Sequence, residues 1–404
     1  MTKQPANRRH LGSEGARSWL AELGRPAFTL LLGLLCVLRQ AGSTDLPQQL
    51  GLHGAREIYQ AACAGCHGPN GEGAPQSIAG FVRPKSFPHF NKCDESTPEY
   101  TRDYKAVIRD GGPARGFSQI MPSFGGVLTS GEMDELVAYL RSFCEEKHWP
   151  VGELNVPRAL MTEKAFPESE TVLTTSFNTR GPPGINNELD YEHVLGKRDQ
   201  FEAAIPFSWM QRDNGGLHGG LGDLMVGIKH VLFANLDSGD SRPPYDETGS
   251  ILSVQGEVSL ATGDAAQGFG SGTTSFGAFA AYDQLLPRQA FIQVQAGTEL
   301  PVHTQYSAHS VYFRSAFGKS FNQGMGLGRQ WTPMVEFVAN RDLVSGSRTD
   351  WDVVPEFQVT LSRRQHVRAA LGYDVPLNDT AGRSTQLMMY VLWDWFDGGL
   401  LEGW

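Results

Sequence analysis

The pentapeptide Cys63-Ala64-Gly65-Cys66-His67 places two thiols three positions apart and an imidazole directly after the second thiol. Thiols at this spacing can add to the two vinyl groups of a porphyrin, and the adjacent histidine can bind the iron. A thioredoxin-like redox pair would need a βαβ pattern around the motif, and a structural zinc site would need a second close pair of ligands. The remaining cysteines of this region, Cys93 and Cys144, stand far apart. The motif therefore predicts one covalently attached haem c, with His67 as an axial ligand.

The second axial ligand of an electron-carrying haem is often a methionine. Met121 suits this role because Pro122 fixes the backbone after it and Gly125-Gly126 permit a tight loop. Met133 is the alternative, but it lies on the apolar stripe of an expected helix, which is typical of a core residue. We therefore predict that Met121 is the distal ligand of the iron.

Three helices are expected to position these ligands. The first runs from about Ala55 to Ala62, directly into the haem motif. The second has Thr97-Pro98 as its N-cap and first helical residue and ends at Gly111-Gly112-Pro113. The third begins with the capping box Thr129-x-x-Glu132.

With the haem motif early, the Met-Pro loop late and a closing helix (132–143), residues 53–144 resemble the class I c-type cytochromes. The resemblance implies an all-α domain whose haem is bound by Cys63, Cys66, His67 and Met121. Such domains mature outside the cytoplasm, where disulfides persist. Cys93 and Cys144 are therefore a candidate disulfide, with two free buried thiols as the alternative.

The first 43 residues have the features of a signal peptide: a basic start, the short apolar run Ala27–Leu38 and small residues at Ala41-Gly42-Ser43. The apolar run is too short to span a bilayer comfortably, so we expect cleavage. The leader holds six Lys/Arg and two Asp/Glu, so its removal takes the net charge from −10 to −14. An acidic chain without a basic cluster argues against a nucleic-acid partner.

From about residue 170 onward, strict alternation of apolar and polar residues replaces helical periodicity. The segments Trp351–Leu361 and Ile292–Leu300 are examples. About twelve such segments follow one another, most of them roughly ten to fourteen residues long, which is the length and number typical of an outer-membrane β-barrel.

A soluble β-sandwich would alternate too, but its strands are usually shorter. In a membrane barrel the apolar face meets lipid and the charged face meets a wet lumen. Most of the six tryptophans of this half lie near strand ends, as aromatic girdles require. The face opposite the apolar one carries Glu202, Asp223, Lys229, Glu257, Gln293, Gln295, Glu299, Arg314, Glu336, Glu356, Arg368, Asp374 and Asp394.

The motifs Gly222-Asp223-Leu224 and Thr262-Gly263-Asp264 resemble the porin-like family of aromatic-degradation operons. A haem domain joined to a barrel also resembles, in outline, the fused cytochrome–porins, whose haem segment is much smaller. We expect a multidomain chain: an all-α cytochrome c domain followed by an all-β antiparallel outer-membrane barrel of about twelve strands. The expected parts are a signal peptide (1–43), the cytochrome domain (44–148), a polar linker (149–170) and the barrel (171–404).

These features indicate an exported electron carrier, tethered to outer-membrane lipid, that exchanges electrons with periplasmic or cell-surface redox partners. Since His67 and Met121 together saturate the iron, we expect no enzyme activity at the haem. Two alternatives stay open: a channel for small molecules with an accessory cytochrome, and a haem enzyme such as a peroxidase. His218, His230, His303, His309 and His366 are scattered and are expected in loops or the lumen.

Overall fold

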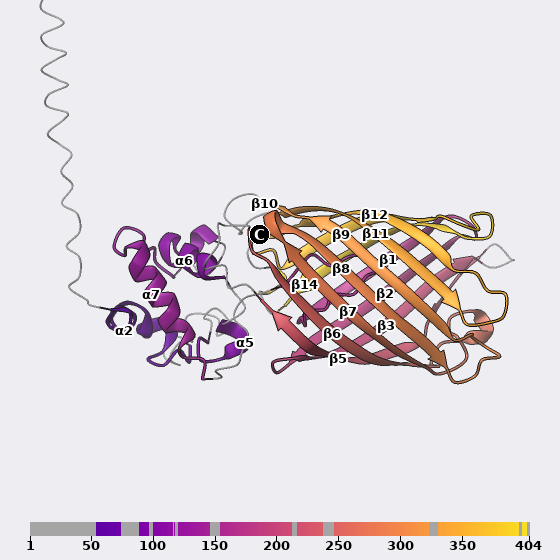
Figure 1. The fold of residues 1–404 in the computed structure, drawn as a ribbon, viewed down its shortest axis with the longest axis horizontal. Coiled ribbons are helices and arrows are strands. Elements are labelled where there is room, and N and C mark those ends of the chain that lie inside the picture. The colour runs from indigo at the N-terminus through magenta and orange to yellow at the C-terminus, as the bar shows by residue number, and fades with distance from the viewer. Residues whose placement is uncertain are drawn as a thin grey trace, which may run out of the picture. The chain divides into compact units, whose positions relative to one another are not determined.

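The structure is a computed structural model that describes residues 54–73, 89–96, 100–115, 117, 120–145, 154–211, 216–236, 246–322, 330–395 and 398–401. The predicted signal peptide and the terminal Trp404 lie outside these residues. Helices occupy the first part of the described chain and strands the second (Figure 1).

The helical part is built from short elements around one apolar cluster. Three elements run without a break into the haem motif: α2 (Ala55–Ile58), η1 (Tyr59–Cys63), which is a π-helical turn, and α3 (Ala64–His67). They are followed by α5 (Cys93–Ser96), α6 (Thr101–Asp110), the 3-10 turn η3 (Pro113–Arg115) and α7 (Ser130–Arg141). The buried core residues are Ile58, Tyr59, Phe90, Ile108, Met133, Leu136, Val137 and Leu140.

The ends of these helices test the sequence prediction. The capping box is confirmed: Thr129 accepts a hydrogen bond from the Glu132 backbone, and the Glu132 side chain accepts one from the Thr129 backbone. The predicted start of the second helix is wrong, because Tyr100 is extended and α6 begins only at Thr101. The predicted cap, Thr97-Pro98, lies outside the described residues. Among the helices that the structure describes, none has the length and apolar character needed to cross a bilayer.

The second part is a closed antiparallel β-barrel (Figure 1). Each strand pairs with its neighbours in chain order, β9 pairs with β11, and β1 pairs with β14. The short strands β4 and β10 extend β5 and β9, so twelve long strands form the wall in the described residues, and the predicted fold class is confirmed. The strands are β1 (Glu170–Arg180), β2 (Gly184–Leu195), β3 (Asp199–Gln211), β4 (Leu217–Leu221), β5 (Leu224–Asn235), β6 (Gly249–Leu260), β7 (Ser275–Leu286), β8 (Ala290–Pro301), β9 (Ser310–Lys319), β10 (Phe321–Asn322), β11 (Gln330–Asp342), β12 (Asp350–Thr360), β13 (Val367–Pro376) and β14 (Thr385–Asp394).

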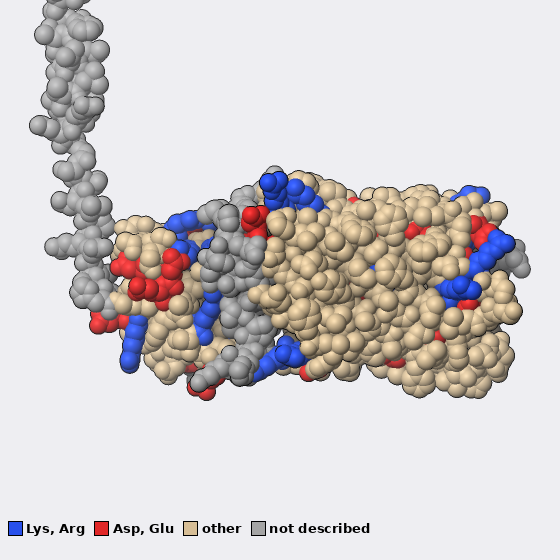
Figure 2. All heavy atoms as spheres, viewed as in Figure 1, with Lys and Arg blue, Asp and Glu red and all other residues tan. Residues whose placement is uncertain are grey.

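The two faces of the barrel wall differ in polarity. Most of the outer wall visible in Figure 2 is free of charged side chains, which gather near the two ends. Exposed apolar residues on this face include Leu173, Ile205, Ile228, Phe276, Phe337, Leu371 and Val391. The buried polar residues on the opposite face include Glu202, Lys229, Gln293, Gln295, Glu336, Glu356, Arg368 and Asp394. The alternation in the sequence therefore separates an apolar exterior from a charged lumen.

Asp223 departs from the predicted lumen face. It lies at the break between β4 and β5, where its carboxylate accepts hydrogen bonds from the backbone of Gly263 (2.9 Å) and Ser271 (2.7 Å). The hydroxyl of Thr262 also donates to the carbonyl of Gly222. The two short motifs singled out in the sequence thus meet at one end of the barrel and fix a loop there.

The predicted linker is ordered where the structure describes it. Residues 154–169 lie in the lumen, and many of their side chains are buried among the residues of the strands. Nothing in the local sequence of this segment indicates that it lies inside a barrel, because most of its partners lie far away in the chain.

Candidate haem site

The two thiols and the imidazole of the haem motif lie on one continuous helical stretch. Cys63 ends the π-helical turn η1, and Cys66 and His67 lie in the single turn of α3. Neither thiol is part of a disulfide, and both are half-buried, whereas His67 is buried. A π-turn accommodates one extra residue and is frequent at functional sites. Here the π-turn lies directly before the haem motif and ends at its first cysteine.

The chain after His67 is held by hydrogen bonds that close a tight loop. Gly68 has a φ of 79° and ends α3, a conformation that a glycine adopts without strain. The buried hydroxyl of Tyr59 donates to the carbonyl of Gly68 (2.6 Å), and the backbone of Gly73 donates to the carbonyl of His67 (2.9 Å). Burial raises the pKa of Tyr59, so its hydroxyl stays protonated as a donor. These contacts fix the backbone on both sides of the imidazole.

The loop that carries Met121 is attached to the end of α6. The backbone of Gly112 donates to the carbonyl of Met121 (3.1 Å), and the backbones of Phe124 and Gly125 donate to the last carbonyls of the helix (2.9 and 3.0 Å). Gly111 permits this contact, because a Cβ there would lie 3.0–3.1 Å from the backbone of residues 121–123. The thioether therefore starts from a backbone with little freedom to move.

Met121 and Met133 occupy different environments. Met133 is 4% exposed and belongs to the apolar core of α7. Met121 is half-buried and packs at the margin of that core, as Cys63 does. This placement favours Met121 as the residue that is available to a bound group.

The residues present fit a covalently held haem. Two thiols outside any disulfide, a buried imidazole and a thioether on a fixed loop make up the donor set that such a haem uses. The rings of His67 and Phe90 lie 4.8 Å apart, and Phe90 belongs to the same apolar cluster that Cys63 and Met121 contact. The donors therefore converge on one apolar surface, which suits a porphyrin. No group of three or more His, Cys, Asp or Glu side chains that could hold a metal ion occurs in the described part of the chain.

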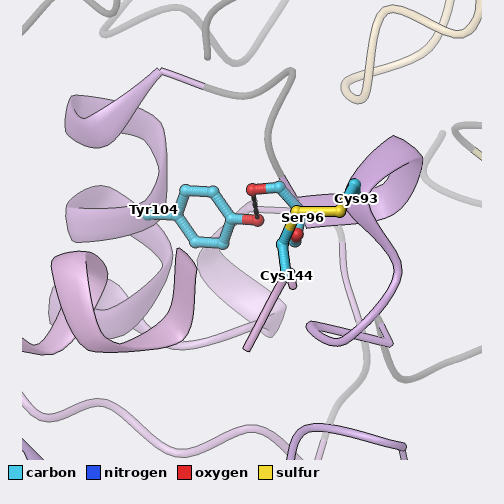
Figure 3. Close-up of a disulfide and its surroundings, with 4 residues drawn as sticks. All are labelled: Cys93, Ser96, Tyr104 and Cys144. Carbon is cyan, nitrogen blue, oxygen red and sulfur yellow. Dashed lines mark hydrogen bonds between the residues drawn. A yellow bond between two sulfur atoms is a disulfide. The ribbon is translucent and has the colours of Figure 1, made fainter. Parts of the chain in front are cut away.

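Cys93 and Cys144 form a disulfide that joins α5 to the segment after α7, with 5.0 Å between their Cα atoms (Figure 3). The hydroxyl of Tyr104 on α6 donates to the carbonyl of Ser96 (2.8 Å) beside this bridge. The ends of three helices are thus held together at one point of the domain.

Two charge effects shape the surroundings of the site. Burial raises the pKa of the Cys63 thiol to about 11, which keeps it protonated and apolar before any haem is attached. A hydrogen bond from Arg109, assisted by Arg115, lowers the pKa of Asp110 to about 2. The Arg109 carbonyl also accepts a hydrogen bond from the Ser123 hydroxyl (2.6 Å). The ion pair of Arg109 with Asp110 therefore lies next to the Met121 loop.

Residues 52–140 match a family model described as cytochrome c oxidase, cbb3-type, subunit III. The match contains both the haem motif and the Met121 loop. The helical part is therefore a c-type cytochrome domain, and a domain of this class implies a haem. A search of curated proteins found no match for the chain.

Several solved barrels are similar to the second part. A KdgM porin has a TM-score of 0.34 at 9% identity and covers 55% of this chain and 98% of its own. An outer membrane channel from Pseudomonas putida F1 has a TM-score of 0.37 at 12% identity, with 59% and 99% covered. The β domain of the Bordetella autotransporter BrkA has a TM-score of 0.30 at 12% identity, with 56% and 98% covered. Scores this low carry no argument about function.

Proposed function

We propose that this protein carries electrons through one haem c and that its barrel anchors the haem domain in the outer membrane. The observation that carries the first half is the convergence of Cys63, His67 and Met121 on one apolar cluster. In the proposed site Cys63 and Cys66 would hold the haem as thioethers, and His67 and Met121 would bind its iron. When bound, the haem supplies reversible one-electron transfer.

The chain's own contribution is to hold these ligands in fixed positions. Tyr59 fixes the loop after His67, and the hydrogen bonds from Gly112, Phe124 and Gly125 fix the loop that carries Met121. A nearly constant ligand geometry suits electron transfer, because little has to rearrange when the charge changes. The same rigidity favours a carrier over an enzyme, since a substrate would have to displace Met121. We therefore propose that the protein is not an enzyme at its haem.

The outward-facing apolar wall of the barrel supports placement in lipid. The tryptophans Trp209, Trp331 and Trp351 are exposed near strand ends, as expected for aromatic girdles. Three short connections, at 196–198, 287–289 and 361–366, share a rim with the start of β1 and the end of β14, whereas one, at 181–183, lies on the opposite rim. Bacterial barrels have their short turns on the periplasmic side, so we propose an exported protein with a periplasmic cytochrome domain.

This arrangement defines the kind of partner that we propose. A haem domain held at the membrane exchanges electrons with redox proteins or mediators that reach it from the periplasm or the cell surface. The outer wall of the barrel would contact outer-membrane lipid.

The first test removes the predicted attachment. In the variant Cys63→Ala/Cys66→Ala we expect no haem signal on a denaturing gel, whereas the control Met133→Leu should keep full staining. Persistent staining of the double variant would show that the haem is not attached through this motif.

The second test addresses the role and place of the protein. The purified wild type should exchange electrons with small redox mediators and show negligible turnover of peroxide. In fractionated cells the protein should stay with the outer membranes after carbonate extraction. Fast peroxide turnover with Met121 still bound would favour the haem-enzyme alternative. Recovery as a freely soluble protein would contradict the anchor.

A further inference from the structure

The segment of residues 154–169, directly before β1, is buried inside the barrel. Leu154, Lys164 and Ala165 are each at most 1% exposed. Lysine is almost never fully buried unless it is paired. A linker on the surface would leave these side chains in water, so the segment belongs to the interior of this domain.

The backbone of the segment is bound by side chains of the wall. The amides of Met161 and Thr162 donate to the carboxylate of Glu336 on β11 (3.0 and 2.7 Å). The amide of Leu160 donates to Glu356 on β12 (3.0 Å), and others donate to Asp283 on β7, Gln295 on β8 and Gln200 on β3. Since this segment has no strand partner, the lumen side chains replace the hydrogen bonds that a sheet would supply.

Two buried cations of the segment are matched to acidic residues. Arg158 forms ion pairs with Glu163 of the segment (3.3 Å), with Glu170 on β1 (3.0 Å) and with Glu192 on β2. Lys164 pairs with Glu168 of the segment and lies 3.7 Å from Glu170. Separating buried partners of this kind is strongly unfavourable, so these pairs hold the segment in place.

The remaining contacts extend around the whole wall. Leu154, Val156 and Leu160 belong to separate apolar clusters that include residues of β5, β6, β7, β8, β11, β13 and β14. Arg314 on β9 donates to the carbonyl of Met161 (2.7 Å). Together with the polar contacts above, the segment reaches all twelve long strands. A chain that contacts every side of the wall crosses the lumen.

We propose that residues 154–169 are a fixed plug that closes the barrel to dissolved solutes, so that the barrel is an anchor and not a pore. Wide barrels leave an aqueous lumen unless a chain segment fills it. The plug fills volume inside the barrel and adds two positive charges, Arg158 and Lys164, to a lumen that is rich in carboxylates. This inference rests on the placement of the barrel in a membrane, but not on the haem or its ligands.

The test compares the full-length protein with a variant in which residues 156–167 are replaced by a Gly/Ser linker of equal length. In planar lipid bilayers the wild type should give no stable conductance steps. The replacement should give steps at least about tenfold above baseline, with preference for cations because the exposed lumen is acidic. Wild-type conductance equal to that of the variant would overturn the plug. A shift in gel migration on heating checks in parallel that each barrel has folded, so a barrel that never inserts counts against the anchor instead.

A second measurement does not require removal of the plug. In otherwise wild-type protein, Thr162→Cys places a thiol at a plug residue that is 1% exposed, and Ser345→Cys places one in the exposed loop between β11 and β12. A small impermeant thiol reagent, applied to liposomes that carry the folded protein, should label Cys at position 345 quickly and leave position 162 unlabelled. Equal labelling rates would show that the lumen is open to solutes, and the plug assignment would then be wrong.

Discussion

At the scale of single residues, the two methionines near the haem motif provide the sharpest distinction. Met121→Ala should lower the reduction potential, remove the sulfur-to-iron absorption band and let carbon monoxide bind, because a methionine axial ligand raises the potential. Met133→Ala should leave all three unchanged and instead cost about 2–5 kcal/mol of stability, as other buried Met-to-Ala changes do. Potentiometry, absorption spectra and thermal unfolding separate the two. The reverse pattern would reassign the distal ligand.

Asp110 makes the stability of the cytochrome domain depend on pH. Its pKa, held at about 2 by Arg109 and Arg115, lies below the ordinary 3.8. Its stabilising contribution is therefore present above about pH 4 and is lost as the pH falls through 2. Asp110→Asn should destabilise the cytochrome domain by about 1 kcal/mol at pH 7 after allowance for solvent screening, and by almost nothing near pH 2.

Guanidinium unfolding of the full-length protein, followed by the haem absorption, measures this difference across pH. Asp134→Asn is the matched control, since it removes an exposed pair with Lys105 and should change stability by less than about 0.5 kcal/mol. A pH-independent loss in Asp110→Asn would mean that the carboxylate charge has no part in holding this region.

At the scale of elements, the capping box of α7 is the local feature that the sequence specifies best. Thr129→Ala removes the acceptor for the Glu132 backbone and should cost about 1 kcal/mol of stability, whereas Thr129→Ser should restore most of it. The hydrogen bonds from Thr129, the backbone one first, lower the pKa of Glu132. Thermal unfolding monitored by circular dichroism measures the loss, and equal stability of the alanine variant would show that the helix does not depend on its cap.

Some elements could be predicted because their cause is local. Alternating residues such as those of Trp351–Leu361 fit two different solvents on the two sides of a sheet, so strands and their count followed from the pattern. The capping box is likewise defined within four residues. The π-helical turn at Tyr59–Cys63 was not predicted, because its sequence does not differ from that of an ordinary helix. The start of α6 was placed too early for a different reason, since Thr97-Pro98 is only one of several possible helix beginnings and α6 begins at Thr101.

The haem ligands and the plug differ in predictability too. Cys63, Cys66 and His67 stand together in the sequence, so their chemistry was visible at once. The groups that fix the Met121 loop are backbone groups at the end of α6 and at Gly112, which no side-chain pattern reveals. The polar residues of 154–169 resembled a linker because their partners, such as Glu336 and Glu356, follow more than 170 positions later.

At the scale of the whole molecule, the outer wall of the barrel makes a prediction about lipid. Ile228 lies in the middle of β5 with 47% of its surface exposed. Ile228→Arg should cost about 2–4 kcal/mol and reduce the yield of folded barrel in lipid vesicles, since a charge at mid-membrane is unfavourable. Tyr306→Arg, at an exposed loop position outside the strands, should have little effect. Equal urea stability of the two variants would argue that the wall faces water.

The first and last strands of the barrel meet each other, and the plug touches both sides of that junction. Arg158 is paired with Glu170 on β1, and its carbonyl accepts a hydrogen bond from Tyr390 on β14 (2.7 Å). An order of assembly follows. Because a closed barrel can be entered only through its ends, we expect the plug to bind the first hairpin while the sheet is still open. The last strand, β14, would then pair with β1 when the plug is already bound to the first hairpin. Damage to Arg158 should therefore show first in the rate of closure, as a long-lived open-sheet intermediate that proteases can cut.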